Sequence, residues 1–219
     1  MLSADHLDAI RSDGTRVAEL ARRDPGRAVP QYPGWDMSGL AGHLAAVHGR
    51  TITICRDLPT ERPSAPHLPE GTDPITWFEE SLGEMLEMLD AADPEALVWG
   101  FWPRSSIGLW QRRMVIETGV HRWDADQAFG EESGLSDIVS RSGLDEFNDM
   151  WLPRLGELPP LEASATDLGL VWVLGNGAPV SALEGTGSDI YLRLMSRPSP
   201  VSLPPVWAEA VDALEPPRR

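Results

Sequence analysis

Glu117 and His121 are a carboxylate and an imidazole four residues apart, in a segment whose pattern is typical of a helix. Residues at this spacing lie one above the other on the same helix face. Ile116, Val120 and Trp123 repeat at helical spacing beside them, which indicates that the pair lies near the protein core. Such a pair can bind one metal ion, or it can be an ordinary pair on a helix surface.

His43 is the candidate for a third ligand. It lies on the apolar side of a second predicted helix, residues 37–57. Bundle cores build metal sites from inward-facing Glu and His residues, and two His with one Glu form an established catalytic zinc set with an open position. The alternative is a hydrogen-bonded core histidine. His48 lies about 140° round the same helix at ~100° per residue, so we expect it not to share a site with His43.

Asp124 follows His121 by about one helical turn. It is either a catalytic residue that orients His121 as a hydrogen-bonded carboxylate behind a metal ligand, or a solvated charge that pairs with Arg122 or Arg113. The spacing leaves both interpretations open.

Composition excludes several classes of function. The chain of 219 residues has a formal net charge of −16, which argues against binding to nucleic acid or to an anionic membrane surface. All its basic residues are arginines, so Schiff-base lysine chemistry is excluded, and the composition suggests a GC-rich bacterial genome. The single cysteine, Cys55, excludes an internal disulfide framework.

The periodicity predicts an α+β protein in two parts. Residues 1–158 are expected to form an up-and-down helical bundle, and the predicted helices are 3–23, 37–57, 74–91, 107–129 and 135–155. Residues 159–219 are expected to form a small α/β domain, with strands at 168–174, 179–184 and 199–203 and helices at 188–195 and 205–214. With no signal peptide pattern and no apolar run of ~18 residues, we expect a cytoplasmic protein.

Two stretches carry a resemblance to a known family. Residues 29–48, VPQYPGWDMSGLAGHLAAVH, and residues 117–128, ETGVHRWDADQA, resemble signatures of the mycothiol-dependent maleylpyruvate isomerase family in composition, order and separation. Residues 166–197 are similar, more weakly, to its C-terminal domain. The resemblance implies a DinB-like metal-binding bundle followed by a small sterol-carrier-like α/β domain.

The resemblance further implies that His43, Glu117 and His121 hold a zinc ion and that mycothiol is the thiol cosubstrate. In the family reaction the thiolate adds to the cis double bond of maleylpyruvate, the new single bond rotates, and the thiol leaves. An arginine of the C-terminal domain is implicated, and Arg197 is the candidate for a catalytic and cofactor-binding role. Its alternative role is a charge at a helix C-terminus. Arg56 and Arg62 lie near the loop after the second helix, but neither matches a family position.

These observations predict an enzyme whose partners are small molecules: an electrophile or an unsaturated dicarboxylate, with no nucleic acid and no membrane, in a monomer or homodimer. Thiol transfer and cis–trans isomerisation compete as reactions, and the unmatched arginines favour transfer. The alternative class is a non-catalytic bundle that binds a ligand or partner and holds a structural metal.

Overall fold

The computed structural model describes residues 4–102 and 104–213. It divides into two compact units, Met1–Ser133 and Gly134–Arg219. Ser3 and Leu214, the outer ends of the first and last predicted helices, lie outside the described residues. No helix in the described ranges is long and apolar enough to cross a bilayer.

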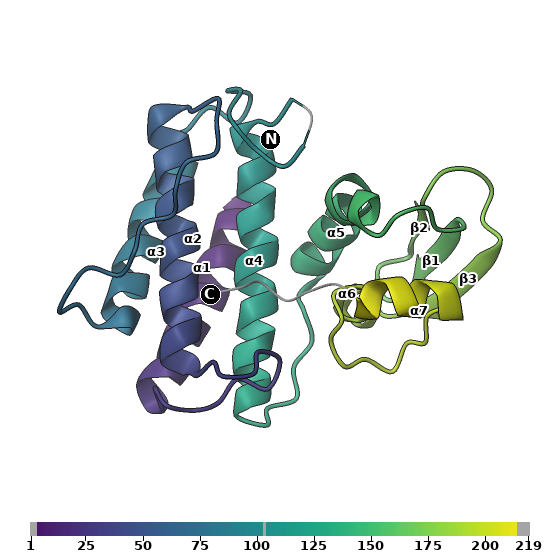
Figure 1. The fold of residues 1–219 in the computed structure, drawn as a ribbon, viewed down its shortest axis with the longest axis horizontal. Coiled ribbons are helices and arrows are strands. Elements are labelled where there is room, and N and C mark those ends of the chain that lie inside the picture. The colour runs from purple at the N-terminus through teal and green to yellow at the C-terminus, as the bar shows by residue number, and fades with distance from the viewer. Residues whose placement is uncertain (1–3, 103, 214–219) are drawn as a thin grey trace. The chain divides into compact units, whose positions relative to one another are not determined.

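Four long helices make up the first unit (Figure 1), and they are α1 (Ala4–Arg23), α2 (Met37–Asp57), α3 (Pro74–Ala91) and α4 (Ile107–Ala128). All four were predicted, because their start signals are local. Asp36 caps α2 by accepting a hydrogen bond from the backbone N of Gly39 at 2.7 Å. Asp73 caps α3 in the same way, with Pro74 at the first helical position.

The helix directions differ from a strictly alternating up-and-down bundle. The N-terminal parts of α2 and α3 lie together, since a Cβ added at Gly42, in the second turn of α2, would lie 3.7 Å from Pro74, the first residue of α3. The two helices therefore run parallel. The segment 58–73 makes this possible by running back along α2 in Figure 1. A helix of 21 residues is roughly 30 Å long, a distance that this extended segment can span.

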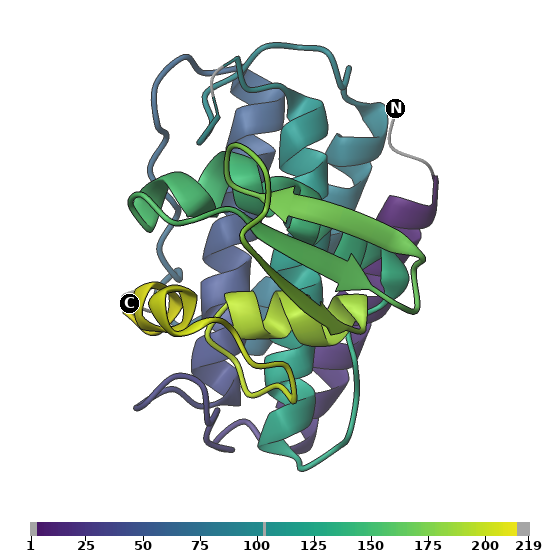
Figure 2. The same ribbon diagram turned by 90° about the vertical axis from the view of Figure 1, so that its right-hand side faces the viewer.

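The second unit joins helices to a three-stranded sheet. Its elements are α5 (Asp137–Glu146), the π turn η1 (Phe147–Trp151), the 3-10 turn η2 (Leu152–Arg154), β1 (Leu161–Ala165), β2 (Leu170–Leu174), β3 (Ser181–Gly185), α6 (Gly187–Leu194) and α7 (Pro205–Asp212). The strand order is β2-β1-β3, with β1 antiparallel to β2 and parallel to β3. The strands lie side by side in Figure 2.

The central strand, β1, was not predicted from the sequence. Its residues LEASA include alanine and glutamate, which are depleted in strands. The predicted strand at 199–203 is wrong, since these residues form no strand in the structure. The flanking prolines cannot donate to a ladder, and the Ser199 hydroxyl instead donates to the carbonyl of Asp189.

The sequence predicted a division between the two parts after residue 158, but in the structure the division falls after Ser133. Helix α5 packs against α6, where a Cβ added at Gly143 would lie 2.5 Å from the ring of Tyr191. The backbone N of Leu135 donates to the Ser188 hydroxyl at 2.8 Å. Residues 134–158 therefore belong to the compact unit that contains the sheet.

Candidate metal centre

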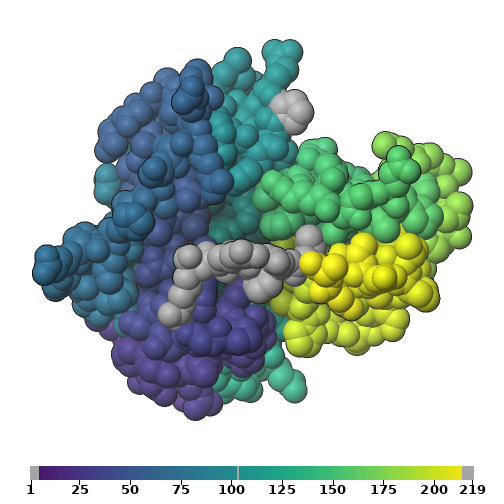
Figure 3. All heavy atoms as spheres, in the orientation of Figure 1, coloured from purple at the N-terminus to yellow at the C-terminus, as the bar shows by residue number. Residues whose placement is uncertain are grey.

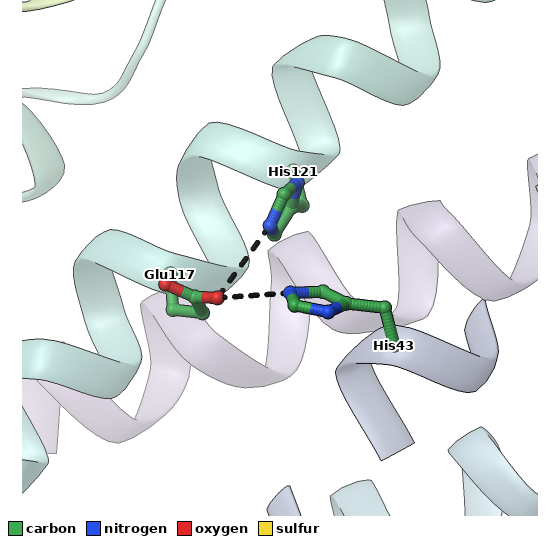
Figure 4. A group of neighbouring side chains, drawn as sticks. All are labelled: His43, Glu117 and His121. Carbon is green, nitrogen blue, oxygen red and sulfur yellow. Dashed lines mark hydrogen bonds and ion pairs between the residues drawn. The ribbon is translucent and has the colours of Figure 1, made fainter. Parts of the chain in front are cut away.

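His43 of α2 and Glu117 and His121 of α4 point toward one another inside the helical unit (Figure 4). One ligand atom from each lies within 4.8 Å of the others. Both histidines approach the same carboxylate oxygen, Glu117 Oε1: His43 Nε2 at 3.2 Å and His121 Nε2 at 3.5 Å. The structure thus brings together the three residues that the sequence singled out.

The donor set fits a zinc ion on two counts. Zinc binds imidazole nitrogen and carboxylate oxygen at roughly 2.0–2.2 Å, so ligand atoms in a tetrahedral site lie roughly 3.3 Å apart. The two measured separations from Glu117 Oε1, 3.2 and 3.5 Å, lie close to that value. Arg113 binds the other oxygen of Glu117, which leaves Oε1 to face the two histidines.

Charges around Glu117 favour its ionised form. Burial by itself raises the pKa of this carboxyl group, but the Arg113 guanidinium and the hydrogen bonds from His121 and His43 outweigh burial and hold the pKa well below its usual value. A carboxylate is the form that binds a metal ion. The site therefore holds a negative ligand ready between two imidazoles.

Asp124 supports the site from behind. Its carboxylate is fully buried and its Oδ2 lies 3.0 Å from His121 Nδ1. Burial by itself lowers the pKa of His121, but the bonds to Asp124 and Glu117 outweigh it and raise that pKa. Burial excludes the solvated alternative for Asp124. A carboxylate on the far nitrogen of a ligand histidine fixes the ring orientation and tautomer.

Two aromatic side chains from the loop before α2 pack on the ligand rings. The Trp35 ring centroid lies 5.1 Å from that of His43, and the Tyr32 centroid lies 5.7 Å from that of His121. The two aromatic rings stack on each other at 4.8 Å, and both side chains are buried. The contact of Tyr32 with a ligand was not predicted, because only the fold brings the loop to α4.

The helical part of the chain matches a known family. Residues 7–126, more than half of the chain, match the model of the mycothiol maleylpyruvate isomerase N-terminal domain. The chain belongs to the mycothiol-dependent maleylpyruvate isomerase family.

Solved structures of the family show the same fold of a helical bundle and a small α/β domain. A crystal structure of the mycothiol-dependent maleylpyruvate isomerase matches with a TM-score of 0.68 at 12% identity, covering 90% of this chain and 91% of that one. A mutant of that isomerase with one histidine replaced by alanine matches with a TM-score of 0.63 at 13% identity, covering 86% of each chain. No curated protein matches the chain. This family member is therefore distant in sequence from those isomerase structures.

The other residues singled out in this family member each make contacts of their own. Arg197 belongs to the second unit, is buried, and donates to the carbonyl of Met195, the C-cap of α6. This contact agrees with its alternative role at a helix end, and its part in catalysis stays a prediction. Arg56 is exposed and pairs with Asp57. Burial raises the pKa of the Cys55 thiol to about 11, so this thiol is protonated at neutral pH.

His48 is a fully buried histidine on α2 that makes no hydrogen bond to any described residue. Burial lowers its pKa from 6.5 to about 3, against the opposing effect of the Glu117 charge. Below pH 6.5 the unfolded chain binds a proton at this position that the folded chain does not bind. The free energy of unfolding therefore falls as the pH falls from 6.5 toward 3.

We expect the variant His48→Met to lose less stability on acidification than the unaltered protein. The difference in the free energy of unfolding between pH 7 and pH 5 should be smaller in the variant by about 2 kcal/mol. The reason is that each pH unit below 6.5 lowers the free energy of unfolding of the unaltered protein by about 1.4 kcal/mol through His48. Urea unfolding at the two pH values measures the change. The exposed His67, replaced in the same way, is the control. An equal pH dependence in His48→Met and the unaltered protein would contradict the prediction.

Proposed function

We propose that this protein is a zinc-dependent enzyme that activates a low-molecular-weight thiol, mycothiol, as a thiolate for addition to an electrophilic small molecule. The observation that supports it most directly is the approach of His43 and His121 to one oxygen of Glu117. Three protein ligands leave a fourth position of a four-coordinate zinc site for water or substrate, as in catalytic zinc sites.

Each neighbouring residue has a defined part in this proposal. When bound, zinc would lower the pKa of the cosubstrate thiol, as it does for bound water. Arg113 holds one oxygen of Glu117 and so keeps the other directed at the histidines. Asp124 orients His121. Tyr32 and Trp35 cover the ligand rings with apolar surface and keep water from them.

Two reactions are compatible with this site. In isomerisation of a maleylpyruvate-type substrate, the thiolate adds to the cis double bond and leaves after rotation, so the thiol is regenerated. In S-transfer the thiol stays bonded to the electrophile and is consumed. Arg197 is proposed as a carboxylate-binding residue in either reaction, because its planar guanidinium suits a carboxylate.

Thiol consumption distinguishes the two reactions. Purified protein is first analysed for metal, and the proposal requires about one zinc ion per chain. Maleylpyruvate is then supplied with a small amount of mycothiol, and turnover beyond the amount of thiol identifies isomerisation. Conjugation of mycothiol to monochlorobimane, with one thiol consumed per product formed, identifies transfer.

Protein that binds no zinc when zinc is supplied would refute the proposal. A zinc-loaded protein that converts neither maleylpyruvate nor monochlorobimane in the presence of mycothiol supports the alternative, a ligand-binding bundle with a structural metal.

A further inference from the structure

A second feature of the helical unit lies between α2 and the segment 58–73. A hollow of about 370 Å³ opens there, and its lining residues are Arg50, Arg62, Pro63, Ser64, Ala65 and His67. The segment packs closely on α2, since a Cβ added at Gly49 would lie 2.4 Å from Pro66. Figure 3 shows the blue atoms of this segment on the viewer's side of the unit. Every residue of the hollow thus comes from one compact unit.

The two arginines of the hollow have no acidic partner among the described residues. The Nε atom of Arg50 is buried and makes no hydrogen bond there. Arg62 lies over the ring of Trp99, with its guanidinium carbon 5.7 Å from the ring centroid, and forms no ion pair in the described ranges. The chain has 34 acidic and only 18 basic residues, and Arg56 nearby does pair with Asp57. Arg50 and Arg62 thus face the hollow with no carboxylate of the described residues to neutralise them.

The charges around the hollow favour binding of an anion. Burial, followed by the positive charge of Arg62, lowers the pKa of Arg50, while the charge of Glu117 acts in the opposite direction. The two guanidinium groups therefore repel each other in a partly desolvated place. An anion between them would relieve this repulsion, and hydrogen bonds between ionised groups are the stronger kind.

The position of Arg50 relates the hollow to the candidate metal centre. Arg50 follows His43 by seven residues on α2, so the two lie on one face of the helix, roughly 10 Å apart along its axis. The effect of the Glu117 charge on Arg50 also indicates that the two sites are close.

We infer that the hollow between Arg50 and Arg62 binds a carboxylate group of a small anionic ligand. The planar guanidinium fork matches a carboxylate with two parallel hydrogen bonds, and Ser64 adds a hydroxyl that can donate. The volume suits a small molecule and not a macromolecule.

Calorimetric titration of the full-length protein with succinate tests this inference. We expect Arg50→Gln and Arg62→Gln each to weaken binding about tenfold, the loss of one charge-assisted interaction. Arg62 is exposed, so its replacement leaves the fold intact. Arg56→Gln, on the same helix and outside the hollow, is the matched control and should bind as the unaltered protein does. Succinamide, which has the same length without charge, should not bind.

The metal content of every sample separates this inference from the proposed function. Binding of succinate that depends on both arginines supports the carboxylate site whether or not zinc is present. Absent zinc with intact succinate binding would overturn the proposed function alone. Succinate that binds equally to all variants, or not at all, would overturn the carboxylate site. Inorganic phosphate that binds more tightly than succinate at the same arginines would also overturn it, in favour of a phosphate site.

Discussion

Alanine at His43 or at His121 is expected to remove bound zinc and, with it, thiol-dependent turnover. Each variant removes one of the three side chains that could hold the metal ion and leaves two. We expect zinc affinity to fall by at least about 100-fold, or roughly 2.7 kcal/mol, because a ligand contributes more than the 10–100-fold of an outer-shell partner. Metal analysis after gel filtration and competition with a chromogenic chelator measure the loss.

A control separates loss of the ligand from loss of the fold. His6 lies on α1 and does not belong to the cluster of His43, Glu117 and His121, so His6→Ala should keep its zinc and its activity. Circular dichroism should show the same helical content in all three variants, since the ligand side chains lie within regular helices. A His43→Ala protein with full zinc content would contradict the assignment of this residue.

Asp124→Asn is expected to weaken zinc binding by about 10–100-fold, the usual effect of losing the partner of a ligand histidine. The substitution keeps the size of the side chain, which is fully buried. It removes the negative charge that lies 3.0 Å from His121 Nδ1 and raises the pKa of that ring. The imidazole then becomes a weaker ligand and loses its fixed tautomer. Chelator competition with the purified variant gives the affinity.

The matched control for this change is Asp57→Asn, which alters an exposed aspartate at the end of α2. This variant should bind zinc as tightly as the unaltered protein. If Asp124→Asn and Asp57→Asn had the same zinc affinity, Asp124 would have a structural role only.

Local signals in the sequence were sufficient for the bundle helices and singled out the three candidate metal ligands, whose metal role the spacing left open. Asp36 and Asp73 start α2 and α3 where the pattern predicted, because a cap bonds to a backbone N only three residues away. The spacing of Glu117 and His121 put both on one face of α4 for the same local reason. These two residues meet His43 because the two predicted helices that carry them pack together. The resemblance to the family implied that these are the helices that share the site.

Contacts between residues far apart in the sequence were decided only by the tertiary structure. The parallel course of α2 and α3 depends on the packing of the segment 58–73, which no periodicity reports. The strand β1 is defined by its pairing with β2 and β3 and not by its own residues. Burial made Asp124 a partner of His121 where the spacing had left it open. Arg50 and Arg62 face one hollow because a loop folds back on a helix, and a sequence pattern does not contain that contact.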